Sequence, residues 1–265
     1  MKGKSMSDLG ARRYWALWAF ALVVVAGLSG CATNPANPDP YEKMNRFFYG
    51  FNGVLDRVAG QPLSSLYVKI TPEPVRKGLG NAFDNLDYFD VVLNDLLQGK
   101  LDQTGQDAAR FVINSTLGVA GILDLATGMG LKAHKEDFGQ TLAVWGIEDP
   151  GPYLMLPVFG PTTVRDAPGV AMSAAADPLL YIDAPIATIT VSAVQAIDER
   201  ARAEEDIQFV KKNAVDGYEF TRKAYLQNRV FLIYDGNPPP SYYENIDDFE
   251  SDLDEDLNDE TENEK

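Results

Sequence analysis

The strongest constraint on the fold of this chain is the helical spacing of its apolar residues. Between residues 41 and 58, six apolar residues follow one another at intervals of three or four: Tyr41, Met44, Phe48, Phe51, Leu55 and Val58. Such intervals place side chains on one face of an α-helix. Phe47 and Val54 widen this face, and charged or amide side chains occupy the other. Because no alternating run of useful length is present, the sequence predicts an all-α fold.

Helix start and stop signals agree with this periodicity. Asp39-Pro40 predicts the start of the first helix, with the acid as N-cap and proline at the first helical position. Thr71-Pro72 repeats the signal, and Gly99 suits the left-handed position after a helix end. Further apolar stripes predict helical segments over 75–86, 89–97, 102–117, 186–200 and 207–235. The segment 118–169 is rich in glycine and proline, which predicts short helices, tight turns and a brief strand pair.

The first 30 residues read as a secretory signal peptide. Arg12-Arg13 precedes an uncharged stretch over 14–28, which is shorter than the roughly 20 apolar residues that span a bilayer. Small residues then precede Cys31, the only cysteine, as in a bacterial lipobox. We therefore expect Cys31 to be lipidated and to begin the mature chain, followed by a proline-rich tether over 31–40. The alternative is an ordinary N-terminal transmembrane anchor with an incidental cysteine.

Charge is concentrated at the C-terminus. The net charge is −16, and twelve acidic residues against one lysine lie in 244–265. This composition predicts a disordered acidic tail over 236–265, after a single compact helical domain over 41–235. An acidic body without a basic stripe is a poor partner for a phosphate backbone, so nucleic-acid binding is disfavoured.

Catalytic and metal chemistry finds little support in the sequence. A single histidine, His134, is expected in a solvated loop, and one cysteine excludes a cysteine-rich metal site. The G-x-G-x-x-A match over 128–133 follows no strand, and no G-x-S-x-G is present. The aspartates at 252–256 lack the glycine and glutamate of a calcium loop. We expect a non-enzyme without cofactor or metal.

Several blocks in order resemble the MlaA (VacJ) family of outer-membrane lipoproteins. The resemblance covers most of residues 39–235, and it departs at Tyr88-Phe89-Asp90, where the family often places an acid–proline pair. The carrying segments are DPYEKMNRFFYGFN (39–52), GLGNAFDNLDYFDVVLNDLLQGK (78–100), RFVINSTLGVAGILDLA (110–126), EDFGQTLAVWG (136–146) and GPYLMLPVFGPTTVRDAPG (151–169).

This resemblance implies a ring-like domain of amphipathic helices lying in the periplasmic leaflet of the outer membrane, lipid-anchored through Cys31. It implies removal of misplaced phospholipids from the outer leaflet, which maintains lipid asymmetry. The partners that it implies are phospholipid, a trimeric outer-membrane porin and a soluble periplasmic lipid carrier. A lipid-modifying hydrolase and a purely structural envelope lipoprotein remain as alternative functions.

The aromatic stripes have two readings, because an amphipathic helix either packs a core or lies flat in a membrane interface. On the second reading, the membrane-facing candidates are Phe47, Phe48, Phe51 and Leu55. The candidates for the lipid path are Tyr49, Asn52, Gly118 and Gly121, which lie in the YGFN and GVAG stretches.

Overall fold

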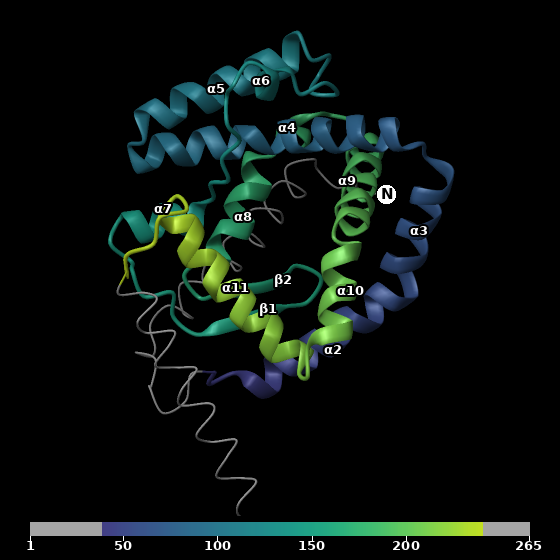
Figure 1. Ribbon diagram of the computed structural model, residues 1–265, viewed down its shortest axis with the longest axis vertical. Helices are drawn as coiled ribbons and strands as arrows, with labels where there is room; N and C mark the ends of the chain where they lie inside the picture. Colours follow the sequence, from purple (N-terminus) through teal and green to yellow (C-terminus); the bar gives the residue numbers. More distant parts are fainter. Residues whose placement is uncertain (1–38, 241–265) are drawn as a thin grey trace, which may run out of the picture.

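A long, bent helical rod opens the structure, a computed structural model that describes residues 39–240. The rod consists of α2 (Glu42–Leu55), the π-helix η1 (Asp56–Gly60) and α3 (Gln61–Ile70). Pro62, at the start of α3, has no N–H and crowds the carbonyl one turn earlier, so the wider π turn forms directly before it. Figure 1 shows α2 and α3 meeting at an angle across this turn.

The residue predicted to cap the N-terminus of α2, Asp39, does not do so. Tyr41, not Asp39, occupies the N-cap position, and no side chain caps the helix. The Asp39 carbonyl accepts a hydrogen bond from the Glu42 N–H (3.2 Å), whereas the Asp39 carboxylate does not cap the helix. It accepts instead from Asn45 Nδ2 at 3.0 Å and from the Tyr218 hydroxyl. The acid therefore connects distant segments and does not cap its own helix.

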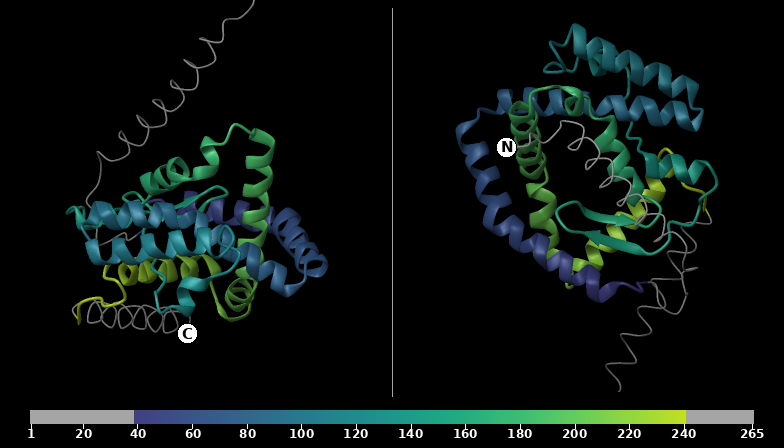
Figure 2. Two further views of the ribbon diagram at one scale, coloured as in Figure 1. Left: turned by 90° about the horizontal axis from the view of Figure 1, so that it is seen from above. Right: turned by 180° about the vertical axis from the view of Figure 1, so that it is seen from behind.

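The stripes predicted as separate helices over 75–86 and 89–97 form one helix, α4 (Glu73–Gln98). Both α5 (Leu101–Thr116) and α9 (Pro185–Arg202) pack against α4, so its apolar side chains face more than one neighbour. Gly99 ends α4 with φ 76°, as predicted, and the chain turns directly into α5. Figure 2 shows these two helices side by side.

The glycine- and proline-rich centre contains the predicted short elements. They are α6 (Leu125–Gly128), α7 (Phe138–Val144), β1 (Tyr153–Leu156), β2 (Gly160–Thr163), α8 (Ala167–Ala176) and the 3₁₀ turn η2 (Pro178–Tyr181). The two strands form an antiparallel hairpin in which Tyr153 pairs with Thr163 and Leu156 with Gly160. The predicted all-α class is confirmed, with this hairpin as its brief strand pair.

The last predicted helix is two helices. After α9 (Pro185–Arg202), the chain forms α10 (Glu204–Asn213) and α11 (Gly217–Ile233). Asp216 starts α11 by accepting hydrogen bonds from the N–H groups of Tyr218 (2.8 Å) and Glu219 (3.2 Å). This N-cap and the following Gly217 break the apolar stripe that suggested one continuous helix.

The helices are arranged around a central region. In Figure 1, α4, α8, α10 and α11 border it, α3 lies farther out beyond α9 and α10, and the hairpin β1–β2 extends into it from one side. The turn end of the hairpin lies toward α10. Helix α9 runs across the layer of the other helices, as the left view of Figure 2 shows. Within residues 39–240, no helix is both long and apolar enough to cross a membrane.

Candidate functional site

The described part of the chain has an unusually polar interior. Nine hydrophobic residues are buried there, against nineteen polar or charged ones. Globular proteins normally bury apolar residues and leave charged ones in water. Many large hydrophobic side chains of this protein are exposed instead, on α2, α3, α5, α9 and the turns between helices. An apolar exterior around a polar interior is the arrangement expected of a protein whose surroundings are apolar.

Helix α2 shows this inversion residue by residue. Its outward face carries six exposed apolar side chains from α2 and η1: Met44, Phe47, Phe51, Val54, Leu55 and Val58. Phe47 is 67% exposed and Val58 72%. The inward face instead places the amides of Asn45 and Asn52 against the hairpin. The predicted membrane-facing candidates Phe47, Phe51 and Leu55 thus lie on the exposed face.

Phe48 does not lie on that face. It is half-buried and packs against the buried cluster of Tyr153, Met155 and Tyr218. The predicted outward position of Phe48 is therefore wrong. The Tyr153 and Tyr218 rings meet edge to face, 6.1 Å between centroids. Burial raises the pKa of the Tyr218 hydroxyl, and its hydrogen bond to the Asp39 carboxylate raises it further. Phe48 belongs to the contact between α2 and the hairpin because its side chain turns toward this cluster.

Two asparagines on α2, seven residues apart, attach the hairpin to the helix. Asn45 Nδ2 donates to the Tyr153 carbonyl and the Met155 N–H donates to Asn45 Oδ1, both at 2.9 Å. Asn52 Nδ2 donates to the Leu156 carbonyl (2.9 Å), and the Val158 N–H donates to Asn52 Oδ1 (2.8 Å). Each amide therefore satisfies one donor and one acceptor of the hairpin backbone, as a neighbouring strand would.

A cavity of about 640 Å³ lies between α2, the hairpin, α10 and α11, and we term it the hairpin cavity. Two of the predicted lipid-path residues, Tyr49 and Asn52, line it. Its apolar lining includes Met155 and Ile207. Both the glycines of α2 that face it, Gly50 and Gly53, leave open space where a Cβ would stand. The cavity thus combines polar, charged and apolar walls.

A second cavity of about 600 Å³, the acidic cavity, lies between α4, α9 and the loop before α7. The two cavities adjoin, because Asp206 lines both. The carboxylates of the acidic cavity are Asp84, Asp87, Asp90, Glu136, Glu199 and Asp206. Partial desolvation in the cavity, with Glu199 beside it, raises the pKa of Asp87 to about 7. Arg202 pairs with Asp84 at 2.8 Å and offsets part of this negative charge.

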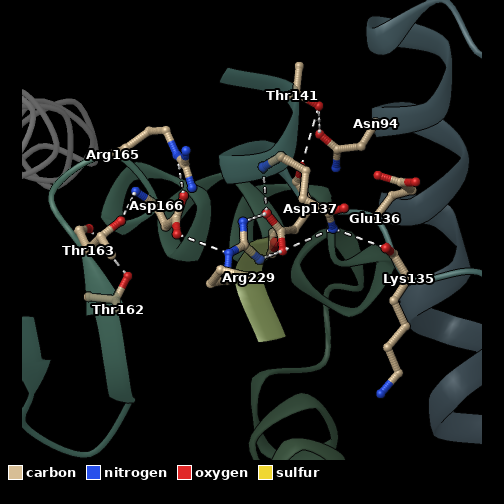
Figure 3. A network of polar contacts seen from close by, with 12 residues as sticks. Asn94, Lys135, Glu136, Asp137, Thr141, Thr162, Thr163, Arg165, Asp166 and Arg229 are labelled. Carbon is tan, nitrogen blue, oxygen red and sulfur yellow. Dashed lines mark hydrogen bonds and ion pairs between the residues drawn. The ribbon is translucent and has the colours of Figure 1, made fainter. Parts of the chain in front are cut away.

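A buried ion network fixes α7, α8 and α11 next to the hairpin (Figure 3). Arg229 lies between two carboxylates, 3.0 Å from Asp137 Oδ1 and 3.0 Å from Asp166 Oδ2, and Arg165 Nε donates to Asp166 Oδ1 at 2.7 Å. Burial opposes ionisation of Asp137, but the hydrogen bonds from Arg229 hold its pKa below the usual range. Gly139 must lack a side chain, because a Cβ there would lie 2.5 Å from Asp166 Oδ1.

Gly118 and Gly121 allow the close packing of the turn between α5 and α6. A Cβ on Gly118 would lie 2.2 Å from the Leu123 carbonyl oxygen, and Gly121 has φ 87° with the Asn85 side chain against it. Neither glycine lines the hairpin cavity or the acidic cavity. A role for them in a lipid path stays a prediction. Cys31 lies outside the described residues.

His134 is not simply solvated, as the sequence suggested. Its Nδ1 lies 2.8 Å from Oδ2 of Asp107, which is fully buried. Asp95 is fully buried beside Asp107, and burial, together with that second carboxyl, raises the pKa of Asp95. The glycines of the G-x-G-x-x-A match lie at the end of α6, after a helix and not after a strand. Among the described residues, no group of three or more histidine, cysteine, aspartate or glutamate side chains could hold a metal ion.

Residues 39–240 define a helical protein with an apolar exterior and a polar interior. The sequence profile of the MlaA lipoprotein family matches residues 37–232. The chain belongs to this family.

Curated relatives and a solved structure agree with this assignment. The chain is 31% identical over 230 residues to the intermembrane phospholipid transport system lipoprotein MlaA of Haemophilus influenzae, covering 82% of this chain and 90% of the relative. It is 30% identical over 234 residues to the protein of that name from Escherichia coli (85% and 92%). A Rickettsia felis protein without an assigned function is 38% identical over 187 residues (70% and 74%).

A solved structure is also similar, with a TM-score of 0.64 and 30% sequence identity, covering 74% of this chain and 98% of that one. It is described as the structural basis for maintenance of bacterial outer membrane lipid asymmetry.

Proposed function

We propose that this protein is an outer-membrane lipoprotein that removes misplaced phospholipids from the outer leaflet and passes them to a soluble periplasmic carrier. The names of the relatives from Haemophilus influenzae and Escherichia coli, which are phospholipid transport lipoproteins, support the transport class. The single observation that carries the proposal for this chain is the inverted polarity of α2, apolar outward and amide-lined inward.

The inversion fits the task physically. A phospholipid has a polar headgroup and apolar tails, so a protein that moves it out of a membrane needs a polar interior within hydrocarbon. An in-plane helix can bury its exposed apolar face in the acyl region while its polar face stays inside the protein. The hairpin cavity, which has both polar and apolar walls, suits part of an amphiphile. No covalent step is needed, so we propose that the protein is not an enzyme.

We further propose that Cys31 carries the lipid anchor, and that the protein lies in the periplasmic leaflet beside a trimeric porin. Cys31→Ser should abolish incorporation of labelled palmitate and processing at that position. Continued labelling of the variant, or a wild-type mature chain that begins elsewhere, would contradict the anchor. Crosslinking from exposed positions of α2 should capture lipid or the porin in intact outer membranes.

The transport proposal is tested in the producing bacterium. A deletion strain should expose more phosphatidylethanolamine to a membrane-impermeant amine reagent than the wild type, and the plasmid-borne gene should reverse this. Unchanged exposure in the deletion strain would favour a purely structural envelope lipoprotein. Release of lysolipid or fatty acid by the purified protein from defined phospholipid would favour a hydrolase.

A further inference from the structure

Arg57 differs from every other arginine of residues 39–240, because it has no hydrogen bond and no ion pair. The others donate to carboxylates or to backbone carbonyls, as Arg46, Arg200 and Arg229 do. Because the other arginines of the described residues are all paired, Arg57 is the one of them that is available to an external anion. Its guanidinium is a fork of donors that matches a phosphate group.

The π-helix sets the environment of Arg57. Single π turns within helices occur frequently at functional sites, and η1 contains Arg57 as its second residue. The neighbouring Asp56 does not neutralise Arg57, because Arg200 holds the Asp56 carboxylate and Lys211 lies 3.7 Å from it. The hydrogen bond from Arg200 holds the pKa of Asp56 below its usual range, so that carboxylate stays ionised and occupied.

Arg57 lines the hairpin cavity together with Lys211, so two cations of separate elements share one cavity. Between them the cavity offers apolar surface from Met155, Ile207 and Val210. Open space lies above the glycines of α2, and Val58, next to Arg57, is exposed on the outward apolar face. The cations are therefore at the boundary between the exposed apolar face and the interior. A glycerophospholipid has the same arrangement, because its anionic phosphodiester is attached directly to the less polar glycerol esters.

We propose that Arg57, assisted by Lys211, binds the phosphodiester of a glycerophospholipid in the hairpin cavity, with the adjoining glycerol ester against Met155 and Ile207. This assignment rests on the proposed function, and it identifies Arg57 as the residue that binds the transported phospholipid. Two acids line the hairpin cavity: Asp56, which Arg200 holds, and Asp206, which lines the acidic cavity as well. Free inorganic phosphate has the same anionic chemistry, so the experiment distinguishes the two.

The test uses the purified mature protein in detergent with two probes that share one photoactivatable acyl chain. One probe is phosphatidylethanolamine, and the other is diacylglycerol, which lacks the phosphodiester. Arg57→Gln should lower the apparent affinity for the phosphatidylethanolamine probe about ten-fold, because the amide cannot replace the charge-assisted hydrogen bonds of the guanidinium to the phosphodiester. Labelling by diacylglycerol should stay unchanged, and Arg57→Lys should restore part of the loss. The matched control Lys212→Gln, an exposed cation of α10, should leave both probes unaffected.

Three results would overturn the proposal. These are an unchanged affinity of Arg57→Gln for phosphatidylethanolamine, an equal loss for both probes, and full displacement of the phospholipid by inorganic phosphate at an equal concentration. Because Arg57 is exposed, the variant should keep the wild-type melting temperature, so a folding defect is separable. If the wild-type gene fails to reverse phospholipid exposure in the deletion strain, the transport proposal fails. If it succeeds and Arg57→Gln binds and complements normally, only the Arg57 assignment fails.

Discussion

Asn45→Ala should be among the most destabilising single changes in the protein. Asn45 is fully buried, and its amide pairs with the Tyr153 carbonyl and the Met155 N–H. Alanine leaves both backbone groups buried without a partner, and each such group costs about 1–3 kcal/mol. The Asp39 carboxylate also loses one of its donors. We expect the free energy of unfolding to fall by about 2–6 kcal/mol.

The assay is equilibrium urea unfolding of the mature protein in a mild detergent, followed by far-ultraviolet circular dichroism. Asn213→Ala is the matched control, because the Asn213 side chain is exposed and donates from Nδ2 to the Phe209 carbonyl (2.8 Å). The control should change stability by less than about 0.5 kcal/mol. A loss below about 1 kcal/mol for Asn45→Ala would refute the reasoning, because the hairpin backbone would then have found water or other partners.

Three further changes test other parts of the fold in the same assay. Arg229→Met should cost about 3 kcal/mol, because it leaves the half-buried Asp137 without its cation and leaves the buried Asp166 with Arg165 alone; a near-neutral result would mean that water replaces the arginine. Asp95→Asn should reduce the pH dependence of folding stability. The pKa of Asp95 is raised in the folded state, so the folded protein keeps a proton that the unfolded chain loses near pH 4. Wild-type stability should therefore fall as pH rises from about 4 through the raised pKa, and an equal slope in the variant would contradict this. Gly118→Ala should destabilise, since its Cβ would meet backbone, whereas Gly105→Ala in open space on α5 should stabilise by about 0.5–1 kcal/mol; equal effects would contradict the packing of the turn.

The helices could be predicted because their causes are local. Apolar spacing located α4, α5 and α9, and glycine and proline content located the short central elements, including the strand pair. Two helix starts were predicted wrongly, one because a side chain pairs with a distant residue and one because an N-cap residue was overlooked. Asp39 pairs with Tyr218 and does not cap α2, and Asp216 starts α11 within an apparently continuous stripe.

The site was harder to predict because its contacts join distant residues. Asn45 and Asn52 pair with backbone more than 100 positions away, and Arg229 with a carboxylate 92 positions away. Two of the lipid-path candidates, Tyr49 and Asn52, line the hairpin cavity, whereas Phe48, assigned to the outward face from the sequence, packs against the buried cluster. The spacing of the two asparagines, seven residues apart on the polar flank of α2, was the one signal that could have indicated an inward polar face.

The central claim is that the outward face of α2 lies in hydrocarbon, and the most direct measurement is the depth of labels along this helix. A fluorophore sensitive to polarity, attached to cysteine at Phe47 or Phe51, should be quenched by doxyl groups on the acyl chains of reconstituted vesicles. The same label at Glu42 or Lys43, the exposed charged residues at the start of α2, should respond to headgroup or aqueous quenchers instead. Aqueous quenching at Phe47 and Phe51, with no effect of acyl-chain doxyl groups, would contradict the in-plane model and the transport path built on it.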